Sequence, residues 1–270
     1  MKYRESIKNS KRIIIKIGTS TLTYENGNIN LGRIEKIARS ISDLINSGKE
    51  VILVTSGAIG VGVSKMHLKK RPESIREKQA AASVGQVALM NIYSKLFGEY
   101  GYSVGQILLT KDNIESDRSK KNVVNTFETL LESNIIPIVN ENDSVSIDEI
   151  ENVSRFGDND NLAATVSILV KADLLIILSD IDGFYDSNPR TNKNAKFIKE
   201  VKSITDEIEG FAEGAGSSLG TGGMETKIHA AKRVTDKGTN MILANGKDPN
   251  ILIDILTGEE VGTLFLGKQM

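Results

Sequence analysis

Short apolar runs of strand length alternate along the chain with segments that have a helical period. The runs cover residues 12–17, 50–55, 105–109, 135–139, 173–178 and 240–244. Each is too short for a convincing helix and predicts a buried strand. The segment 31–48 is the clearest helix, because its apolar residues share one face and Gly48 stands where a left-handed cap belongs.

Four further segments have helical patterns, and they cover about residues 73–100, 120–133, 161–171 and 224–237. The repeated order of strand and helix predicts an α/β fold whose mostly parallel sheet carries helices on both faces. The acidic segment 144–156 alternates in part and predicts either a β-hairpin or a mobile flap. The glycine-dense segment 210–223 predicts a loop.

Composition is that of an ordinary globular protein, with 39% hydrophobic and 26% charged residues among 270. The formal net charge of −1 gives no long-range field for nucleic acid or an anionic membrane, so we expect neither partner. No apolar run approaches the ~20 residues that a bilayer span needs, and residues 1–11 lack the apolar centre of a signal peptide. The absence of cysteine is compatible with a reducing compartment, and we expect a cytoplasmic protein.

Small polar residues follow the first two predicted strands. Lys16 near the end of the first is followed by Gly18, Thr19 and Ser20, and the second is followed by Thr55-Ser56-Gly57-Ala58, Gly60 and Gly62. Ligands of parallel α/β sheets bind beyond the carboxyl ends of the strands. A lysine beside such a turn suits phosphate, because its ammonium is a mobile charge and the turn supplies N–H donors. The alternative for Lys16 is a surface lysine beside an ordinary turn.

Two clusters of Asn and Asp come later in the chain, Asn-Glu-Asn-Asp at residues 140–143 and Gly-Asp-Asn-Asp-Asn at residues 157–161. A helix cap explains one or two residues of the second cluster, but not five matched to another Asn/Asp cluster, and we favour a functional site. Neither cluster has the ligand spacing of an EF-hand, so calcium is not expected.

The glycine-rich loop 214–223 opens into a predicted helix, and Lys227 lies about one turn inside it. Backbone N–H groups at a helix start, together with a lysine, suit a polyphosphate. The spacing fits neither G-x-x-x-x-G-K-[ST] nor G-x-G-x-x-G, which implies a different nucleotide fold. The alternative is a flexible surface loop.

The polar segment 179–186 follows the fifth predicted strand and makes Asp180 a candidate for nucleotide contact, although turn signals explain most of it. The two histidines, His67 and His229, have no paired acid or nucleophile. Their isolation argues against a hydrolase triad and a zinc enzyme.

Taken together, these motifs resemble the amino acid kinase family, most closely its members that act on glutamate. They are residues 16–20, 55–58 and 140–143, Gly-Asp-Asn-Asp-Asn-Leu at 157–162, and residues 220–227, which begin Gly-Thr-Gly-Gly-Met. The resemblance implies a three-layer αβα sandwich over residues 1–270. Glutamate would bind over about residues 1–170 and ATP over about residues 171–270. The implied reaction is ATP-dependent phosphorylation of the glutamate side-chain carboxylate, the first step of proline biosynthesis.

The same resemblance assigns roles to individual residues. Lys16 and Lys227 would contact the phosphates, and Asp160 would orient both lysines, which makes these three the expected catalytic residues. The residues expected to bind glutamate are Ser56, Gly57, Asn142, Asp143, Asp158 and Asn159. The residues expected to bind ATP are Lys16, Ser179, Asp180, Thr221, Gly222, Gly223, Met224, Glu225, Thr226 and Lys227. Mg²⁺ is an expected companion of ATP, with no ligand assigned.

The resemblance also implies partners. It predicts proline as a feedback inhibitor, acting at the flap 144–156, a homo-oligomer, and contact with glutamate-5-semialdehyde dehydrogenase. Many members of the family carry an additional PUA domain, and we expect none here, because the sequence ends at Met270.

Three alternatives remain. The first is a kinase of the same fold that acts on acetylglutamate, aspartate, carbamate or a nucleoside monophosphate. The second is a catalytically silent sensor of proline or glutamate. The third, a nucleic-acid-binding protein, is disfavoured by the neutral charge.

Overall fold

The computed structural model describes residues 2–24, 27–70, 72–145, 159–212 and 223–268. Within this part of the chain, eight strands form one sheet, and two more form a separate antiparallel hairpin, β6 (Phe184–Tyr185) and β7 (Phe197–Ile198). In spatial order the sheet contains β3 (Val104–Leu109), β4 (Ile136–Glu141), β2 (Glu50–Val54), β1 (Arg12–Ile17), β5 (Leu174–Ser179), β9 (Asn240–Asn245), β10 (Thr263–Phe265) and β8 (Glu200–Val201). Its neighbours pair in parallel except β9 and β10, which are antiparallel.

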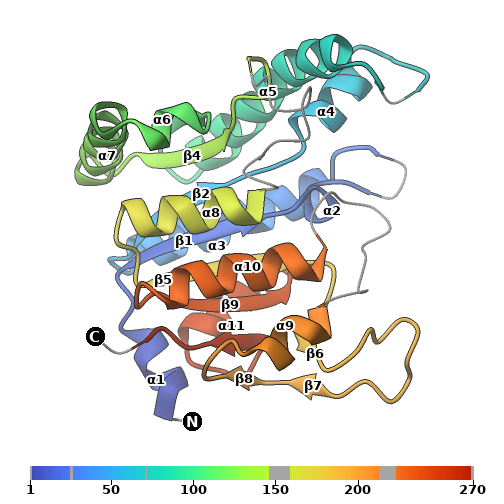
Figure 1. Ribbon diagram of the computed structural model, residues 1–270. Coiled ribbons are helices and arrows are strands. Elements are labelled where there is room, and N and C mark those ends of the chain that lie inside the picture. Colours follow the sequence, from blue (N-terminus) through green and yellow to red (C-terminus); the bar gives the residue numbers. More distant parts are fainter. Residues whose placement is uncertain (1, 25–26, 71, 146–158, 213–222, 269–270) are drawn as a thin grey trace.

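Helices pack on both faces of this sheet, and Figure 1 shows α8 and α10 in front of it with α3 and α11 behind. One face carries α1 (Lys2–Lys8), α2 (Thr19–Leu22), α3 (Leu31–Asn46), α4 (Ala58–Lys65), α5 (Ile75–Gly98) and α11 (Ile251–Leu256). The other carries α6 (Asp112–Glu115), α7 (Asp117–Glu132), α8 (Asn159–Leu169), α9 (Asp206–Ala212) and α10 (Met224–Thr235). The expected three-layer αβα sandwich with a mostly parallel central sheet is therefore confirmed.

The central strands explain why their sequences read as continuous apolar runs. In β1, Ile13 and Ile15 belong to the core on one face of the sheet and Ile14 to the core on the other. A strand that is covered by helices on both faces has no solvent-facing side, so its sequence does not alternate between apolar and polar residues.

All six predicted strands and all five predicted helices are present, with ends that differ by a few residues. Gly48 follows α3 with a φ of +87°, the left-handed conformation that its position predicts. Other elements escaped prediction, including α1, α4, α9, α11 and the short strands. These are one or two turns long, or two to three residues in the case of the strands, and a short stretch carries little periodicity.

The small residues after β2 form a helix, α4, which the sequence analysis did not predict. Gly62 and Gly85 let α4 and α5 pack in close contact. A Cβ atom at Gly62 would lie 1.8 Å from the carbonyl oxygen of Ala81, and one at Gly85 would lie 1.8 Å from that of Ala58. The small residues of this segment therefore serve helix packing as well as the turn at Gly57.

Two predicted features fall mostly outside the described residues. They are the acidic segment 144–156, of which residues 144 and 145 are described, and the glycine-rich loop 210–223, of which residues 210–212 and 223 are described. Among the described helices, none combines the length and the apolar character that crossing a membrane requires.

Candidate functional site

Four adjacent parallel strands, β4, β2, β1 and β5, end at one edge of the sheet and bring the candidate residues together there. Lys16 lies near the end of β1, paired with Val54 of β2 on one side and Ile177 of β5 on the other. Helices α8 and α10 begin above this edge and add side chains from their first turns. The site therefore combines strand ends with helix starts.

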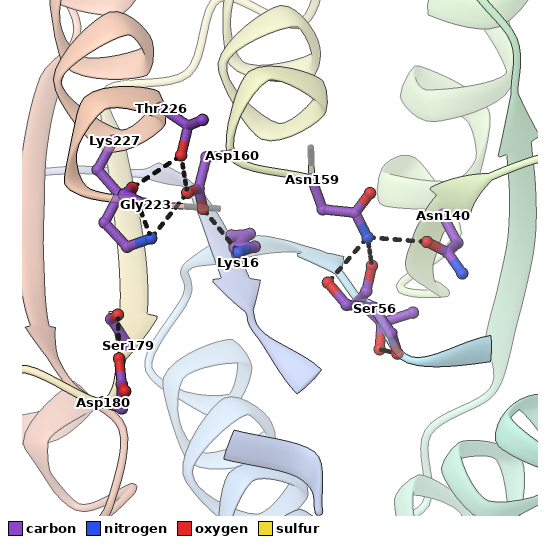
Figure 2. A network of polar contacts seen from close by, with 11 residues as sticks. Lys16, Ser56, Asn140, Asn159, Asp160, Ser179, Asp180, Gly223, Thr226 and Lys227 are labelled. Carbon is purple, nitrogen blue, oxygen red and sulfur yellow. Dashed lines mark hydrogen bonds and ion pairs between the residues drawn. The ribbon is translucent and has the colours of Figure 1, made fainter. Parts of the chain in front are cut away.

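Asp160 joins the two predicted phosphate-binding lysines. Its Oδ1 lies 2.6 Å from Nζ of Lys16 and its Oδ2 lies 3.0 Å from Nζ of Lys227 (Figure 2). The carboxylate comes from the first turn of α8, Lys16 from β1 and Lys227 from α10. Asp160 is 0% exposed and the lysines are 7% and 6% exposed. The expected grouping of Lys16, Asp160 and Lys227 is therefore present.

The charges of this group explain the ionisation of Asp160. Burial by itself would raise the pKa of Asp160, but the ammonium groups of Lys16 and Lys227 outweigh burial and hold that pKa well below its usual value. Thr226 adds a hydroxyl whose Oγ1 lies 3.2 Å from Oδ2 of Asp160 and 2.9 Å from the carbonyl oxygen of Gly223. Two cationic groups are thus held in place by one anionic group.

A second group of polar side chains surrounds Asn159, the residue before Asp160. The Nδ2 of Asn159 donates to the carbonyl oxygen of Thr55 at 2.6 Å, to Oγ of Ser56 at 2.8 Å and to Oδ1 of Asn140 at 3.0 Å. These contacts connect α8 to the ends of β2 and β4 (Figure 2). Since Asn159 and Asp160 are consecutive, the amide group and the lysine group are held next to each other.

The turn after β2 is fixed by a buried hydrogen bond to α5 and by a glycine. Oγ1 of Thr55 and the hydroxyl of Tyr93 on α5 lie 2.8 Å apart in a buried hydrogen bond. Burial raises the pKa of Tyr93, so its phenol stays neutral. Gly57 has a φ of +88°, which favours glycine, and is the N-cap of α4. Ser56 and Gly57 therefore occupy a well-defined turn at the strand end.

Ser179 and Asp180 form a third group after β5. The hydroxyl of Ser179 donates to Oδ1 of Asp180 at 3.2 Å, and Nη2 of Arg190 donates to Oδ2 of Asp180 at 2.7 Å. Partial burial would raise the pKa of Asp180, but the hydrogen bond and charge of Arg190 outweigh it and lower that pKa. Figure 2 shows this pair apart from the Asn159 group.

Other predicted residues are placed less centrally. Met224 is 8% exposed and packs in the core, whereas Glu225 is exposed. Asn142 and Asp143 follow the end of β4, and the side chain of Asn142 accepts a hydrogen bond from Ser144. Their roles stay predictions, as does that of Gly223. The candidate residues Asp158, Thr221 and Gly222 lie outside the described residues.

Two buried polar residues of α5 escaped prediction. Gln86 accepts a hydrogen bond from Asn140, and Tyr93 is bonded to Thr55. The sequence did contain an indication of Gln86, because it lies four residues after Ala82 and three before Leu89, on the buried face of α5. A lone glutamine among apolar positions of one helix face is the pattern that could have identified it.

Comparisons with known proteins place this geometry in a family. The amino acid kinase family matches residues 11–245. A glutamate 5-kinase from Clostridium perfringens is 66% identical over 266 residues, which cover 98% of this chain and 99% of that protein. A glutamate 5-kinase from Listeria innocua is 60% identical, with 98% of this chain and 96% of that protein covered.

Solved structures agree on the fold. A carbamate kinase from Giardia lamblia bound to AMP-PNP aligns with a TM-score of 0.66 at 17% identity, covering 97% of this chain and 100% of the other. A UMP kinase from Bacillus anthracis aligns with a TM-score of 0.64 at 17% identity, covering 96% and 97%. The chain therefore belongs to the amino acid kinase family and, within it, to the glutamate 5-kinases.

Proposed function

We propose that this chain transfers the γ-phosphoryl group of ATP to the side-chain carboxylate of L-glutamate, which gives L-glutamyl 5-phosphate and ADP and begins proline biosynthesis. The observation that carries the proposal is the pair of buried ammonium groups of Lys16 and Lys227, fixed by Asp160 beside the amide of Asn159. Its relatives at 60–66% identity are glutamate 5-kinases.

The chemistry needs no general base. A glutamate carboxylate is ionised at neutral pH and is itself the nucleophile. One of its oxygens forms a bond to the γ-phosphorus of ATP, while the bond from that phosphorus to the β,γ-bridging oxygen breaks and its electron pair leaves with ADP. Negative charge spreads over the transferring group and the leaving oxygen.

The two lysines suit that distribution of charge. A buried, preorganised ammonium stabilises charge that develops in the transition state more than an ammonium in water does. Asp160 holds both ammonium groups at hydrogen-bond distance, so they need not reorganise during the reaction. We assign Lys16 and Lys227 to the phosphates and Asp160 to positioning both.

The remaining roles follow the two halves of the domain. We assign the glutamate site to residues of the half before about residue 170: Ser56, Gly57, Asn142, Asp143, Asp158 and Asn159. We assign the nucleotide site to the half after it, with Ser179, Asp180 and residues 221–227. Ser56 and Asn159 are in direct hydrogen-bond contact, which supports a shared role.

Mg²⁺ fits this site as a companion of the nucleotide. Among the described residues, no group of three His, Asp or Glu side chains could hold a metal ion, and Mg²⁺ in kinases is bound largely by phosphates and water with one or two carboxylates. When bound, it would neutralise charge on the β- and γ-phosphates. Asp180, which is exposed directly after β5 and paired with Arg190, is a carboxylate near which such an ion could bind.

Further partners are proposed on the family resemblance. Proline is the proposed feedback inhibitor, since it shares the α-carboxylate and amino nitrogen of glutamate. A homo-oligomer is supported by Val84 and Val87, which leave 41% and 63% of their surface exposed on α5. Contact with glutamate-5-semialdehyde dehydrogenase would deliver the unstable acyl phosphate to the enzyme that reduces it. The proposed compartment is the cytoplasm.

The test is ADP release with ATP and Mg²⁺, with hydroxylamine present to trap an acyl phosphate as a hydroxamate. L-Glutamate is compared with acetylglutamate, aspartate, carbamate, UMP and no acceptor. Glutamate-dependent ADP release with trapped hydroxamate is expected. Turnover with another acceptor would identify that acceptor, rather than glutamate, as the substrate. Binding of glutamate or proline without turnover would indicate a sensor.

A further inference from the structure

The amide of Asn159 is held in one orientation. Its Nδ2 faces three oxygen acceptors, on Thr55, Ser56 and Asn140. Its Oδ1 lies on the side away from Ser56 (Figure 2), and within the described part of the chain that oxygen accepts no hydrogen bond. The site therefore offers an oxygen acceptor, rather than an N–H donor, at this position.

That orientation depends on Asn140, whose own amide could be rotated to exchange oxygen and nitrogen. Oδ1 of Asn140 faces Asn159 only because its Nδ2 is directed elsewhere, to Oε1 of Gln86 at 2.9 Å. Both side chains are buried, with Asn140 2% and Gln86 8% exposed, so water does not supply an alternative partner. Three amides thus form a chain in which each nitrogen donates to the next oxygen, from Asn159 through Asn140 to Gln86.

Gln86 gains little stability from this position. Its Nε2 is buried and, among the described residues, has no hydrogen-bond partner. A buried, unpaired donor carries a desolvation penalty that an apolar side chain of similar size would avoid. The neighbouring Gly85 lets α5 pack against α4, which holds the backbone at Gln86 close to the end of the sheet. The amide of Gln86 is therefore better explained by what it orients than by what it stabilises.

We propose that Gln86 is a positioning residue for the amino-acid site. Acting through Asn140, it presents Oδ1 of Asn159 as an acceptor for the ammonium group of the amino-acid substrate. An ammonium group donates and cannot accept, so a rotated Asn159 amide would oppose it with N–H groups. This inference rests on the proposed function, and it concerns substrate affinity rather than the phosphoryl transfer step.

The central variant is Gln86→Met, which keeps the length of the side chain and removes the acceptor. We expect the KM for glutamate to rise about five- to tenfold, the worth of one buried hydrogen bond. The KM for ATP and kcat should stay within about twofold of wild type, because the lysine group is untouched. The melting temperature should not fall, since an unpaired donor is removed. Gln86→Asn, which is too short to reach Asn140, should raise the same KM.

The conservative variant is Gln86→Glu, which retains an oxygen acceptor for Asn140. It should keep a KM for glutamate near that of wild type, although its buried charge lowers the melting temperature. If Gln86 had only a structural role, the less stable variant, Gln86→Glu, would have a higher KM for glutamate than Gln86→Met. Phe97→Leu, a buried change on the same helix α5, is the matched control and should lower stability without changing either KM.

Calorimetric titration of glutamate without ATP should show the same order of affinities as the KM values. An unchanged KM in Gln86→Met or Gln86→Asn, with wild type active, would overturn this inference and leave the proposed function standing. A wild-type protein that neither turns over nor binds glutamate would overturn the proposed function and this inference with it.

Discussion

Asp160 carries its negative charge in a fully buried position between two lysines. Such a group gains from attraction and loses from desolvation, and the two terms largely offset each other in stability. What the arrangement provides is geometry, because Asp160 holds each ammonium group at a fixed place. At the scale of single residues, the site is therefore organised by charge pairing. Replacing one of its lysines should affect activity far more than replacing a lysine on the surface.

Lys227 should be essential to turnover. In Lys227→Met, we expect kcat to fall by at least about 100-fold, because one preorganised cation is lost from the transition state. Asp160 keeps its contact with Lys16, so the fold should persist. Lys232→Met is the matched control on the same helix, since Lys232 is exposed and pairs with Glu209. Steady-state kinetics of both variants, with circular dichroism, is the measurement; near-normal turnover of Lys227→Met would contradict the assigned role.

The low pKa of Asp160 predicts a pH-dependent contribution to stability. Its folded pKa lies below its unfolded value, so the contribution is complete above about pH 5, where the unfolded carboxyl is also ionised, and is lost as pH falls through and below about 4. Replacement by Asn leaves two buried ammonium groups without their partner, and at pH 7 we expect a loss of about 3–5 kcal/mol.

Urea unfolding of wild type and Asp160→Asn between pH 7 and pH 3.5 checks this prediction. The difference in unfolding free energy between the two proteins should shrink as the pH falls. Asp236, an exposed carboxylate paired with Lys268, provides the control, because Asp236→Asn should cost little at any pH. A constant difference across the range would argue against a depressed pKa for Asp160.

At the scale of elements, the packing of α4 on α5 links the core to the proposed amino-acid site. Helix α4 begins directly after Ser56 and Gly57, and Gly85 lies against the first residue of that helix, Ala58. Any side chain at position 85 must displace α4, and the turn that carries Ser56 moves with it. We therefore expect changes in the packing of this helix pair to affect the proposed substrate site.

Gly85→Ala tests this connection. The added Cβ would lie 1.8 Å from the carbonyl oxygen of Ala58, so we expect a loss of stability of about 1–3 kcal/mol and a higher KM for glutamate. Gly98→Ala, at the end of the same helix, meets no atom within 4 Å and should be neutral or slightly stabilising. Thermal unfolding and kinetics of the two variants distinguish them, and equal behaviour would reject the steric explanation.

At the scale of the whole molecule, α1 joins the beginning of the chain to its last strand. The guanidinium of Arg4 donates to the carbonyl oxygens of Val261 at 2.7 Å and Gly262 at 2.9 Å, next to β10. Arg4 is 5% exposed, and burial lowers its pKa, although nearby Glu260 and Glu200 oppose that effect. The contact lies beside β10, which is separated from β1 and its Lys16 by β5 and β9.

Arg4→Met should therefore reduce stability without changing catalysis. Loss of charged donors to buried carbonyl groups is worth about 1.5–3 kcal/mol, while kcat and both KM values should stay at wild-type levels. Glu5→Gln, on the exposed side of the same helix, should change neither stability nor the kinetic constants. Differential scanning calorimetry beside kinetics is the measurement. A loss of turnover in folded Arg4→Met would show that α1 acts on the site.

The amino-acid sequence by itself determined the order of strands and helices, the sandwich architecture and the edge at which the site lies. Apolar runs such as β1 indicate buried strands, and the polar residues that follow them indicate where the strands end. Both patterns can be seen in a short stretch of sequence. The motifs around Lys16, Asp160 and Lys227 also carried enough resemblance to identify the family and its chemistry.

Only the tertiary structure decided which side chains meet across long separations in sequence. Gln86 and Asn140 are 54 residues apart, and Lys227 and Asp160 are 67 apart. Periodicity shows that Gln86 lies on a buried face but not which partner covers it. That partner, Asn140, lies on β4, so it depends on where α5 is placed beside the sheet, and the close contacts of Gly62 and Gly85 hold α5 against α4. Hydrogen bonds require an accuracy of a few tenths of an ångström, and positions of this accuracy arise only when all layers of the fold are packed together.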